Sequence, residues 1–148
     1  MTAPSCALCA GDGGEVLYRD ELLRVVLVDV PGYPGFVRVI ANAHVREMTD
    51  LAAADRQRLL AAVFAVESAQ REALAPHKIN LASLGNVTPH LHWHVIPRFA
   101  DDPHFPNPVW GERKRAAPHA APFDLDAQLT ASLHSLLGVG RGSMTLKP

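Results

Sequence analysis

Three histidines at alternate positions, His90, His92 and His94, are the residues of this 148-residue chain with the clearest chemical potential. Imidazole changes its charge near neutral pH, binds metals and can act as a nucleophile. A two-residue spacing is the period of a β-strand, so a strand would place the three rings on one face and bury the intervening apolar residues on the other. The spacing therefore predicts a reactive or metal-binding strand face. A polar strand face without a site is the alternative.

Two chemistries fit this face. One is a metal site on all three imidazoles with an open position for water. The other is attack of an imidazole on phosphorus, which gives a phosphohistidine intermediate. The preceding segment, Gly85-Asn86-Val87-Thr88, offers a glycine turn, backbone N–H groups and polar side chains that suit phosphate oxygens. The residues alone leave both chemistries open.

The histidines must be positioned by a sheet. Runs rich in Val, Leu and Ile predict short strands, which we expect at residues 15–19, 22–30, 36–40, 78–84 and 90–98. The turn-forming stretch Pro31–Gly35 joins the second and third of these as an antiparallel hairpin.

Two helices should accompany this sheet. A long helix is expected from Thr49 or Asp50, both good N-caps, to about Ala75, where Pro76 ends it. A second helix is expected at residues 124–137, followed by a frayed tail. The sum is an α+β fold: roughly five strands, mostly antiparallel, with one long helix and a C-terminal helix.

Length and composition predict a single domain over residues 1–148, with an N-terminal segment at 1–14 and a Pro-rich loop and helix at 100–148. The charge is nearly balanced, with 14 Lys and Arg against 15 Asp and Glu, so no nucleic-acid partner is expected. No apolar run is long enough to span a bilayer and no leader is visible, so we expect no membrane partner and a cytoplasmic location.

The two cysteines, Cys6 and Cys9, stand in a Cys-x-x-Cys spacing. In a reducing compartment this spacing indicates a redox pair or half of a metal site before it indicates a structural disulfide. A structural zinc site needs four ligands, so the pair alone leaves the alternative of two incidental thiols.

The segment 90–96, His-Leu-His-Trp-His-Val-Ile, resembles the alternating histidine motif of the histidine triad (HIT) superfamily. Asn80 and Gly85 stand near the asparagine and glycine that the family places ahead of its triad. Asp29 resembles the family's ribose-binding acid, and Pro97-Arg98 the usual end of the strand. Over residues 22–99 and the cysteine pair, the chain resembles a bacterial HIT protein of the Hint or dinucleoside-polyphosphate-hydrolase type.

The resemblance implies a HIT-like fold and an enzyme: a nucleotide hydrolase or nucleotidyl transferase acting at the α-phosphate of a nucleoside phosphoramidate, dinucleoside polyphosphate or nucleotidyl ester. It implies that His92 is the nucleophile, that His94 contacts the phosphate or the leaving group, and that His90 positions the strand. The implied substrate contacts are Asp29, Asn80, Asn86 and Val87.

The loop before the triad departs from the family pattern. Asn86 stands where many relatives have Gln, and Val87 where many have Ser or Thr, so only the backbone N–H of Val87 can donate there. This departure supports the alternative of a nucleotide- or protein-binding module with little catalysis.

Zinc-containing relatives complete a site with a loop histidine and the first triad histidine. The resemblance therefore implies a structural zinc on Cys6, Cys9, His44 and His90, with no organic cofactor. A metallohydrolase with its metal on all three triad histidines is a further hypothesis. HIT relatives commonly form two-fold dimers that join their sheets, so a homodimer is expected.

Two further expectations concern the substrate. We expect the nucleobase pocket among apolar residues of the first hairpin, and a polyphosphate chain to be attracted by Arg98. The basic segment 113–115 could attract it too, but a solvated basic loop is the favoured interpretation of that segment. The hairpin residues are Leu23, Val25, Leu27 and Phe36.

Overall fold

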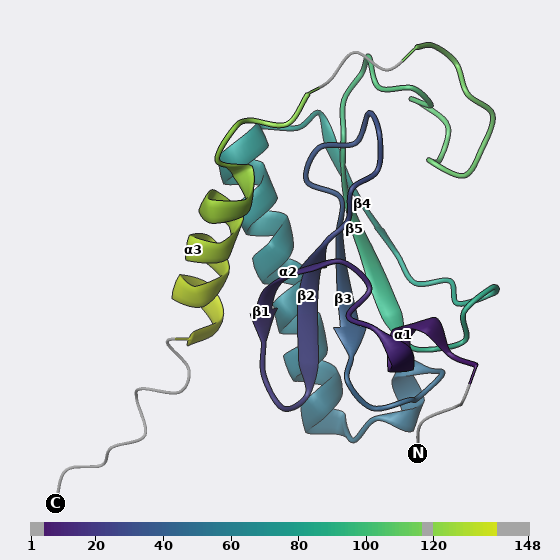
Figure 1. Ribbon diagram of the computed structural model, residues 1–148, viewed down its shortest axis with the longest axis vertical. Helices are drawn as coiled ribbons and strands as arrows, with labels where there is room; N and C mark the ends of the chain where they lie inside the picture. The colour runs from purple at the N-terminus through teal and green to yellow at the C-terminus, as the bar shows by residue number, and fades with distance from the viewer. Residues whose placement is uncertain (1–4, 117–119, 139–148) are drawn as a thin grey trace, which may run out of the picture.

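The structure, a computed structural model, describes residues 5–116 and 120–138; the predicted tail at 139–148 lies outside them. A five-stranded sheet in the order β1-β2-β3-β5-β4 is built entirely from antiparallel pairs (Figure 1). Its strands are β1 (Glu15–Arg19), β2 (Leu23–Leu27), β3 (Val37–Ala41), β4 (Lys78–Ala82) and β5 (His92–Arg98). The helices are α1 (Ala7–Ala10), α2 (Ala53–Leu74) and α3 (Leu125–Gly138), with a 3₁₀ turn η1 (Met48–Asp50) before α2. The predicted α+β fold is confirmed.

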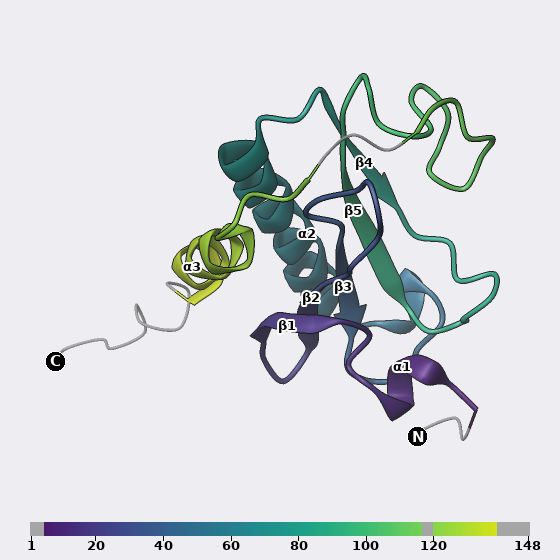
Figure 2. The same ribbon diagram turned by 45° about the horizontal axis from the view of Figure 1, so that its top comes forward.

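The two longer helices cover one face of the sheet. Figures 1 and 2 show α2 and α3 side by side on one side of it and α1 on the other. Val25, Val39 and Val95 of three strands are fully buried together with Leu59 and Val63 of α2. Each buried aliphatic side chain of this kind contributes about 1.5–3 kcal/mol. The opposite face is therefore left to carry the polar side chains of the sheet.

The long helix begins later than its N-cap residues predict. Asp50 accepts hydrogen bonds from the backbone N–H groups of Arg46 and Glu47, at 3.1 and 2.9 Å, and so stabilises the 3₁₀ turn η1 instead. α2 then starts at Ala53. Its end agrees with the prediction, since Ala75 adopts a left-handed conformation with φ of 44° directly before Pro76.

Three strands are shorter than predicted, and one difference concerns the triad. β2 ends at Leu27 rather than residue 30, and β4 ends at Ala82 rather than residue 84. β5 begins at His92, so His90 lies outside the strand. Leu91 pairs instead with the end of β3 and the loop after it: its N–H donates to the carbonyl of Val45 at 2.7 Å, and its carbonyl accepts from the N–H of Ala41 at 3.1 Å. The expectation of three histidines on one strand is therefore wrong for His90.

No helix within residues 5–116 and 120–138 combines the length and the apolar character that crossing a bilayer requires.

Candidate active site and metal centre

His92 lies at the start of β5, on the sheet face away from α2, and is held in one orientation. Its Nδ1 lies 2.6 Å from the backbone carbonyl oxygen of His90. A carbonyl only accepts, so Nδ1 carries the proton and Nε2 keeps its lone pair. Ser83 adds a second restraint by donating to the carbonyl of His92 at 2.8 Å. An imidazole with a free, oriented Nε2 is a competent nucleophile.

His94 is buried two residues further along the same face, and its Nδ1 has no hydrogen-bond partner. Its ring packs edge-on against Phe36 and Trp110, with ring centres 5.7 and 5.0 Å away. Burial, with smaller contributions from His92 and Arg38, lowers the pKa of His94 to about 4. His94 is therefore neutral at physiological pH, with an unused polar atom inside the site.

His90 is fully buried, and its ring packs edge-on against that of His44, with ring centres 5.1 Å apart. Its Nε2–H donates to the carbonyl of Ala41 at 2.7 Å, which leaves Nδ1 as the lone-pair nitrogen. That Nδ1 lies 3.4 Å from the sulfur of Cys6 and 3.2 Å from Nδ1 of His44. His90 therefore belongs to a separate cluster at the start of β5, on the same side of the sheet as His92 and α1 (Figure 1).

The cluster consists of Cys6, Cys9, His44 and His90, whose ligand atoms all lie within 4.8 Å of one another. A tetrahedral zinc bound to two sulfurs and two nitrogens requires N···N near ~3.3 Å and S···N near ~3.6 Å. The cluster has 3.2 Å for the nitrogen pair and 3.3 to 3.5 Å for three S···N pairs. The residues fit a zinc ion without rearrangement. Within the described parts of the chain, neither His92 nor His94 belongs to a group able to hold a metal.

The cysteine segment is held on the sheet by Arg24 of β2. This buried guanidinium donates to the backbone carbonyls of Leu8 at 2.6 Å, Asp12 at 2.8 Å and Gly11 at 3.2 Å. It also donates to the side chain of Asn42 at 3.3 Å, two residues before the ligand His44. Arg24 therefore joins the two chain segments that supply three of the four ligands.

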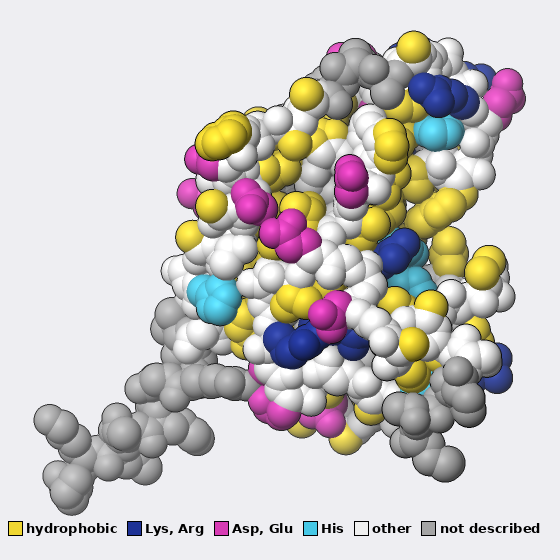
Figure 3. All heavy atoms as spheres, viewed as in Figure 1, with side chains coloured by type: hydrophobic (Ala, Val, Ile, Leu, Met, Phe, Trp, Pro, Cys, Tyr) yellow, Lys and Arg dark blue, Asp and Glu magenta, His cyan; other side chains and the backbone are white. Residues whose placement is uncertain are grey.

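A second arginine, Arg38 of β3, lies directly beside His94 in the strand register. Figure 3 shows histidine and basic side chains next to one another in a hollow on the right of the molecule. The Nε of Arg38 is buried without a partner, and its Nη1 reaches only the carbonyl of Gly13, at 3.5 Å. Burial lowers the pKa of Arg38. The reactive face therefore carries a cation whose hydrogen bonds are largely unused.

Arg98, expected to attract polyphosphate, is instead a buried structural residue. Its Nε donates to Asp102 at 2.7 Å, and its Nη1 donates to Oδ1 of Asn80 at 2.7 Å. Burial raises the pKa of Asp102, but Arg98 and the backbone N–H groups of His104, Phe105 and Phe99 outweigh it and lower the pKa to about 2. This pair fixes the start of the Pro-rich loop, so the expectation for Arg98 is wrong because its charge is neutralised.

The Pro-rich loop brings Trp110 onto His94. The indole is 53% exposed although one edge contacts the imidazole, so it forms an open aromatic wall of the reactive face. Arg115 secures the loop by donating to the carbonyls of Asp102 and Phe105 at 2.6 and 2.7 Å. The basic segment 113–115 thus contributes one anchoring residue rather than a free patch.

The predicted substrate contacts lie at different places. Asn80 is half-buried on β4 beside Arg98, whereas Asn86 is exposed and Val87 is 96% exposed in the loop before the triad. Gly85, with φ of 74°, forms the predicted glycine turn of that loop. In the structure, the side chains of Asn86 and Val87 therefore face solvent.

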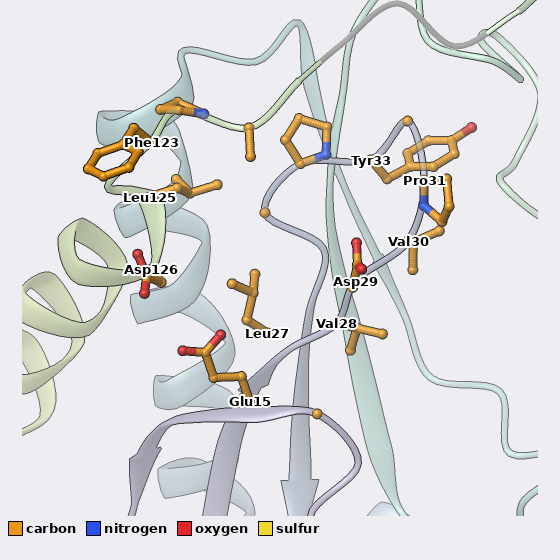
Figure 4. A pocket seen from close by; sticks show the side chains of 16 residues that line it. Glu15, Leu27, Val28, Asp29, Val30, Pro31, Tyr33, Phe123, Leu125 and Asp126 are labelled. Atoms are coloured by element: carbon orange, nitrogen blue, oxygen red, sulfur yellow. The ribbon is translucent and has the colours of Figure 1, made fainter.

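Asp29 lines a separate cavity of about 740 Å³ between the loop after β2 and the start of α3. Figure 4 shows its carboxylate with those of Glu15 and Asp126 around this hollow, together with the apolar side chains of Leu27 and Leu125. This is larger than the hollow of about 630 Å³ that is lined by Trp110, the residue in contact with His94. Chemistry rather than size identifies the candidate active site.

The expected nucleobase pocket is only partly correct in its location. Leu23 and Val25 face α2 in the main core, so they are unavailable to a ligand. Leu27 lines the cavity at Asp29, and Phe36 packs against His94. The β-strand alternation places Leu23 and Val25 on the helix side, and the sequence alone did not show which side that was.

Three residues of the site were missed from the sequence: Arg24, Arg38 and Trp110. Each arginine interrupts a run of aliphatic residues in a strand, at the positions that face away from the helices. A charged residue inside such a run is an available signal, because burying a guanidinium requires compensating partners. Trp110 gave no comparable signal, since its contact with His94 depends on the path of an irregular loop.

Comparison with known proteins supports the same family. Residues 13–101 match the HIT domain, that is 89 of the 148 residues. A curated relative, AP-4-A phosphorylase of Mycobacterium tuberculosis, is 28% identical over 106 residues, which cover 68% of this chain and 54% of the relative. The chain therefore spans about half the length of the curated relatives that it matches.

Solved structures agree with the fold. A histidine triad protein from Marinobacter aquaeolei is 30% identical, with a TM-score of 0.67 over 89% of this chain and 93% of that protein. A zinc-bound histidine triad family protein from Mycobacterium smegmatis, 24% identical with a TM-score of 0.63 over 91% and 97% of the two chains, shares the fold. With more than half of its length matched, the chain belongs to the HIT domain family.

Proposed function

We propose that this protein is a nucleotide hydrolase or nucleotidyl transferase that works at an α-phosphate through a phosphohistidine on His92. The observation that carries the proposal is the hydrogen bond from Nδ1 of His92 to the carbonyl of His90, which leaves Nε2 available for attack. Membership of the HIT domain family and similarity to a protein named AP-4-A phosphorylase support the same chemistry.

The reaction has two steps. Nε2 of His92 attacks the α-phosphorus, forming an N–P bond while the bond from phosphorus to the leaving group breaks, and the leaving group takes the electron pair. An acceptor then attacks the same phosphorus, and the N–P bond breaks to return the lone pair to Nε2. The acceptor is water in a hydrolase and inorganic phosphate in a phosphorylase. Splitting one displacement into two in this way lowers each barrier.

The proposed substrate is a nucleoside phosphoramidate or a dinucleoside polyphosphate. His94 contacts the phosphate or the leaving group, consistent with its buried and unpaired Nδ1. Asn80, Asn86 and the backbone N–H of Val87 are the proposed phosphate contacts, and Asp29 is the proposed ribose contact. Because Asn86 and Val87 are exposed, their role requires the loop to close over the ligand.

We further propose that Cys6, Cys9, His44 and His90 bind a structural zinc ion. The distances between their ligand atoms support this assignment, as does the Nε2–H of His90, which is used by Ala41. A bound zinc would fix His90 and with it the carbonyl that orients His92. Both cysteines are free thiols, as zinc binding and a reducing cytoplasmic location require.

A homodimer is the proposed assembly. β4 is an edge strand of the sheet, and its Leu81 is 39% exposed. An unpaired edge with an exposed apolar residue can accept the same strand of a second copy. Light scattering of the wild-type protein should give twice the mass of the chain, and Leu81→Lys should shift it toward the monomer. A monomeric wild type would contradict this assembly.

The catalytic proposal is tested with His92→Ala. Turnover of a diadenosine polyphosphate or an adenosine phosphoramidate should fall by at least about 10³-fold, while nucleotide binding persists. Intact-protein mass spectrometry after a substrate pulse should detect a nucleotidyl adduct in the wild type and none in the variant. His77→Ala is the matched control, because His77 is exposed and packs only near Phe105.

The alternative is a binding module with little catalysis, which the exposed Val87 in place of a hydroxyl residue favours. Nucleotide binding without any adduct or turnover in the wild type would support the module. Unchanged turnover in His92→Ala would overturn the catalytic proposal.

A further inference from the structure

Arg38 is the least satisfied of the arginines buried on the reactive face. Adjacent residues of antiparallel strands lie about 5 Å apart, and the pairing of Arg38 with His94 puts both side chains on the same face. The guanidinium is half-buried, its Nε has no partner, and its one printed hydrogen bond, to Gly13, is 3.5 Å long.

The other two arginines of this face have hydrogen-bond partners for most of their donors. Arg24 donates to three backbone carbonyls and to Asn42, and Arg98 is paired with Asp102 and bonded to Asn80. In the described parts of the chain, Arg38 has no carboxylate within ion-pair distance. Partial burial of a cation without a counter-charge is unfavourable, so the position fits an anion supplied by a ligand.

We propose that Arg38 binds a second phosphate of the substrate, next to the phosphate attacked by His92. The inference rests on the proposed function and narrows it: the site selects nucleotides with a phosphoanhydride chain over those with a neutral leaving group. A guanidinium suits this role because its planar donors match two oxygens of one phosphate.

The chemistry of the two substrate classes explains the selection. When a phosphoanhydride is cleaved, the bridging oxygen leaves with the electron pair as part of a phosphate, and the leaving group gains negative charge. Arg38 stabilises that charge without transferring a proton. An amine leaving group instead needs a proton, which a guanidinium cannot supply because it stays charged. Arg38 therefore assists the first class and does nothing for the second.

Binding of AMP and ADP tests this directly, because the two ligands differ by one phosphate. Calorimetry of the wild-type protein should show ADP binding about 10- to 100-fold more tightly than AMP, the range of charge-assisted hydrogen bonds. Arg38→Gln should abolish this difference while AMP affinity changes less than about threefold. Arg71→Gln removes one positive charge from an exposed position on α2 and should behave as the wild type.

The outcomes separate the two proposals. Failure of the wild type to bind either nucleotide would overturn the proposed function, and this inference with it. Equal affinities for AMP and ADP in the wild type, or a preference for ADP that survives in Arg38→Gln, would overturn the role of Arg38 alone.

A charge-retaining variant covers the case in which Arg38→Gln does not fold. Arg38→Lys keeps the charge but loses the two-pronged geometry, so the preference for ADP should shrink without vanishing. An unchanged preference in Arg38→Lys would contradict two-pronged binding of the second phosphate.

Discussion

The backbone carbonyl of His90 accepts a 2.6 Å hydrogen bond from the imidazole of His92, while the imidazole of His90 faces Cys6, Cys9 and His44. One residue thus contributes its side chain to the candidate metal centre and its backbone to the candidate nucleophile. The two sites share no side chain, yet the position of one carbonyl depends on the ligands of the other. Under the proposed function, the state of the cysteine cluster should therefore affect catalysis by His92.

The first prediction concerns the tautomer of His92. Because a carbonyl holds Nδ1, ¹⁵N NMR of the neutral ring should show Nδ1 protonated and Nε2 unprotonated. The exposed His77 should show a mixture of the Nδ1-protonated and Nε2-protonated tautomers. An Nε2-protonated His92 would contradict the orientation on which nucleophilic attack depends.

The second prediction concerns the metal. Elemental analysis of the purified protein should give about one zinc per chain, with zinc lost in Cys6→Ser/Cys9→Ser. Loss of a structural zinc should remove at least ~3 kcal/mol of stability, which corresponds to a fall in Tm of about 6–12 °C for a domain of this size. Turnover should fall as well, because His90 then keeps only its hydrogen bond to Ala41 and the carbonyl that orients His92 is less firmly held.

A chelator provides the control for the metal prediction. The chelator should lower the Tm of the wild type and leave the Tm of Cys6→Ser/Cys9→Ser unchanged. Zinc retained in the double variant would instead assign the metal to the triad histidines.

The third prediction concerns the buried pair of Arg98 and Asp102. Asp102→Asn should lower stability by about 3–5 kcal/mol, since the charge of Arg98 is left unpaired and buried. Arg58→Ala is the comparison, because the side chain of Arg58 is 43% exposed in its ion pairs with Asp20 and Glu21, and its removal should change stability by less than about 1 kcal/mol. Urea unfolding of both variants measures the difference; similar effects would contradict the importance of burial.

The same pair gives a pH dependence with a defined sign. The pKa of Asp102 is lowered to about 2 in the folded protein, so its ionisation stabilises the fold above the ordinary carboxyl pKa, near ~3.9. That contribution is lost as the pH falls from about 4 toward about 2. The stability difference between wild type and Asp102→Asn should therefore be full at pH 7 and narrow in acid. A difference that widens in acid would contradict the assignment.

The fourth prediction uses the two tryptophans. Trp110 contacts His94 on the reactive face, whereas Trp93 lies on the other face with its Nε1–H directed at the sulfur of Met48, 3.4 Å away. Nucleotide binding should change the fluorescence of Trp93→Phe as it does in the wild type, and leave that of Trp110→Phe nearly constant. A fluorescence change that is lost in Trp93→Phe and kept in Trp110→Phe would show that the nucleotide does not bind beside Trp110.

The sheet and both longer helices could be predicted from the spacing of their apolar residues and from the turn and terminating residues, such as Pro31–Gly35 and Pro76, that bound them. The boundaries were less predictable: Asp50 is a good N-cap by type, but it caps the short turn before α2. His90 was assigned to the strand by spacing, yet the pairing of Leu91 with the loop after β3 decides where the strand begins. Such pairings depend on residues far apart in sequence.

The metal ligands were found through resemblance, and the structure brings all four together. Arg98 was misjudged for a physical reason: a sequence shows a charge but not its partner, and Asp102 neutralises it four residues later. The contacts proposed for Asp29, Asn80, Asn86 and Val87 stay predictions. They depend on a bound ligand, and the side chains of Asn86 and Val87 are exposed in the loop before the triad.

Arg24 has a kinetic consequence for metal exchange. Its guanidinium ties the cysteine segment to the loop before His44 through bonds that do not involve the metal. The ligands are therefore preorganised, and an incoming ion does not have to bear the entropic cost of gathering them. A zinc ion bound at the proposed site should therefore leave and return without unfolding of the sheet or the helices.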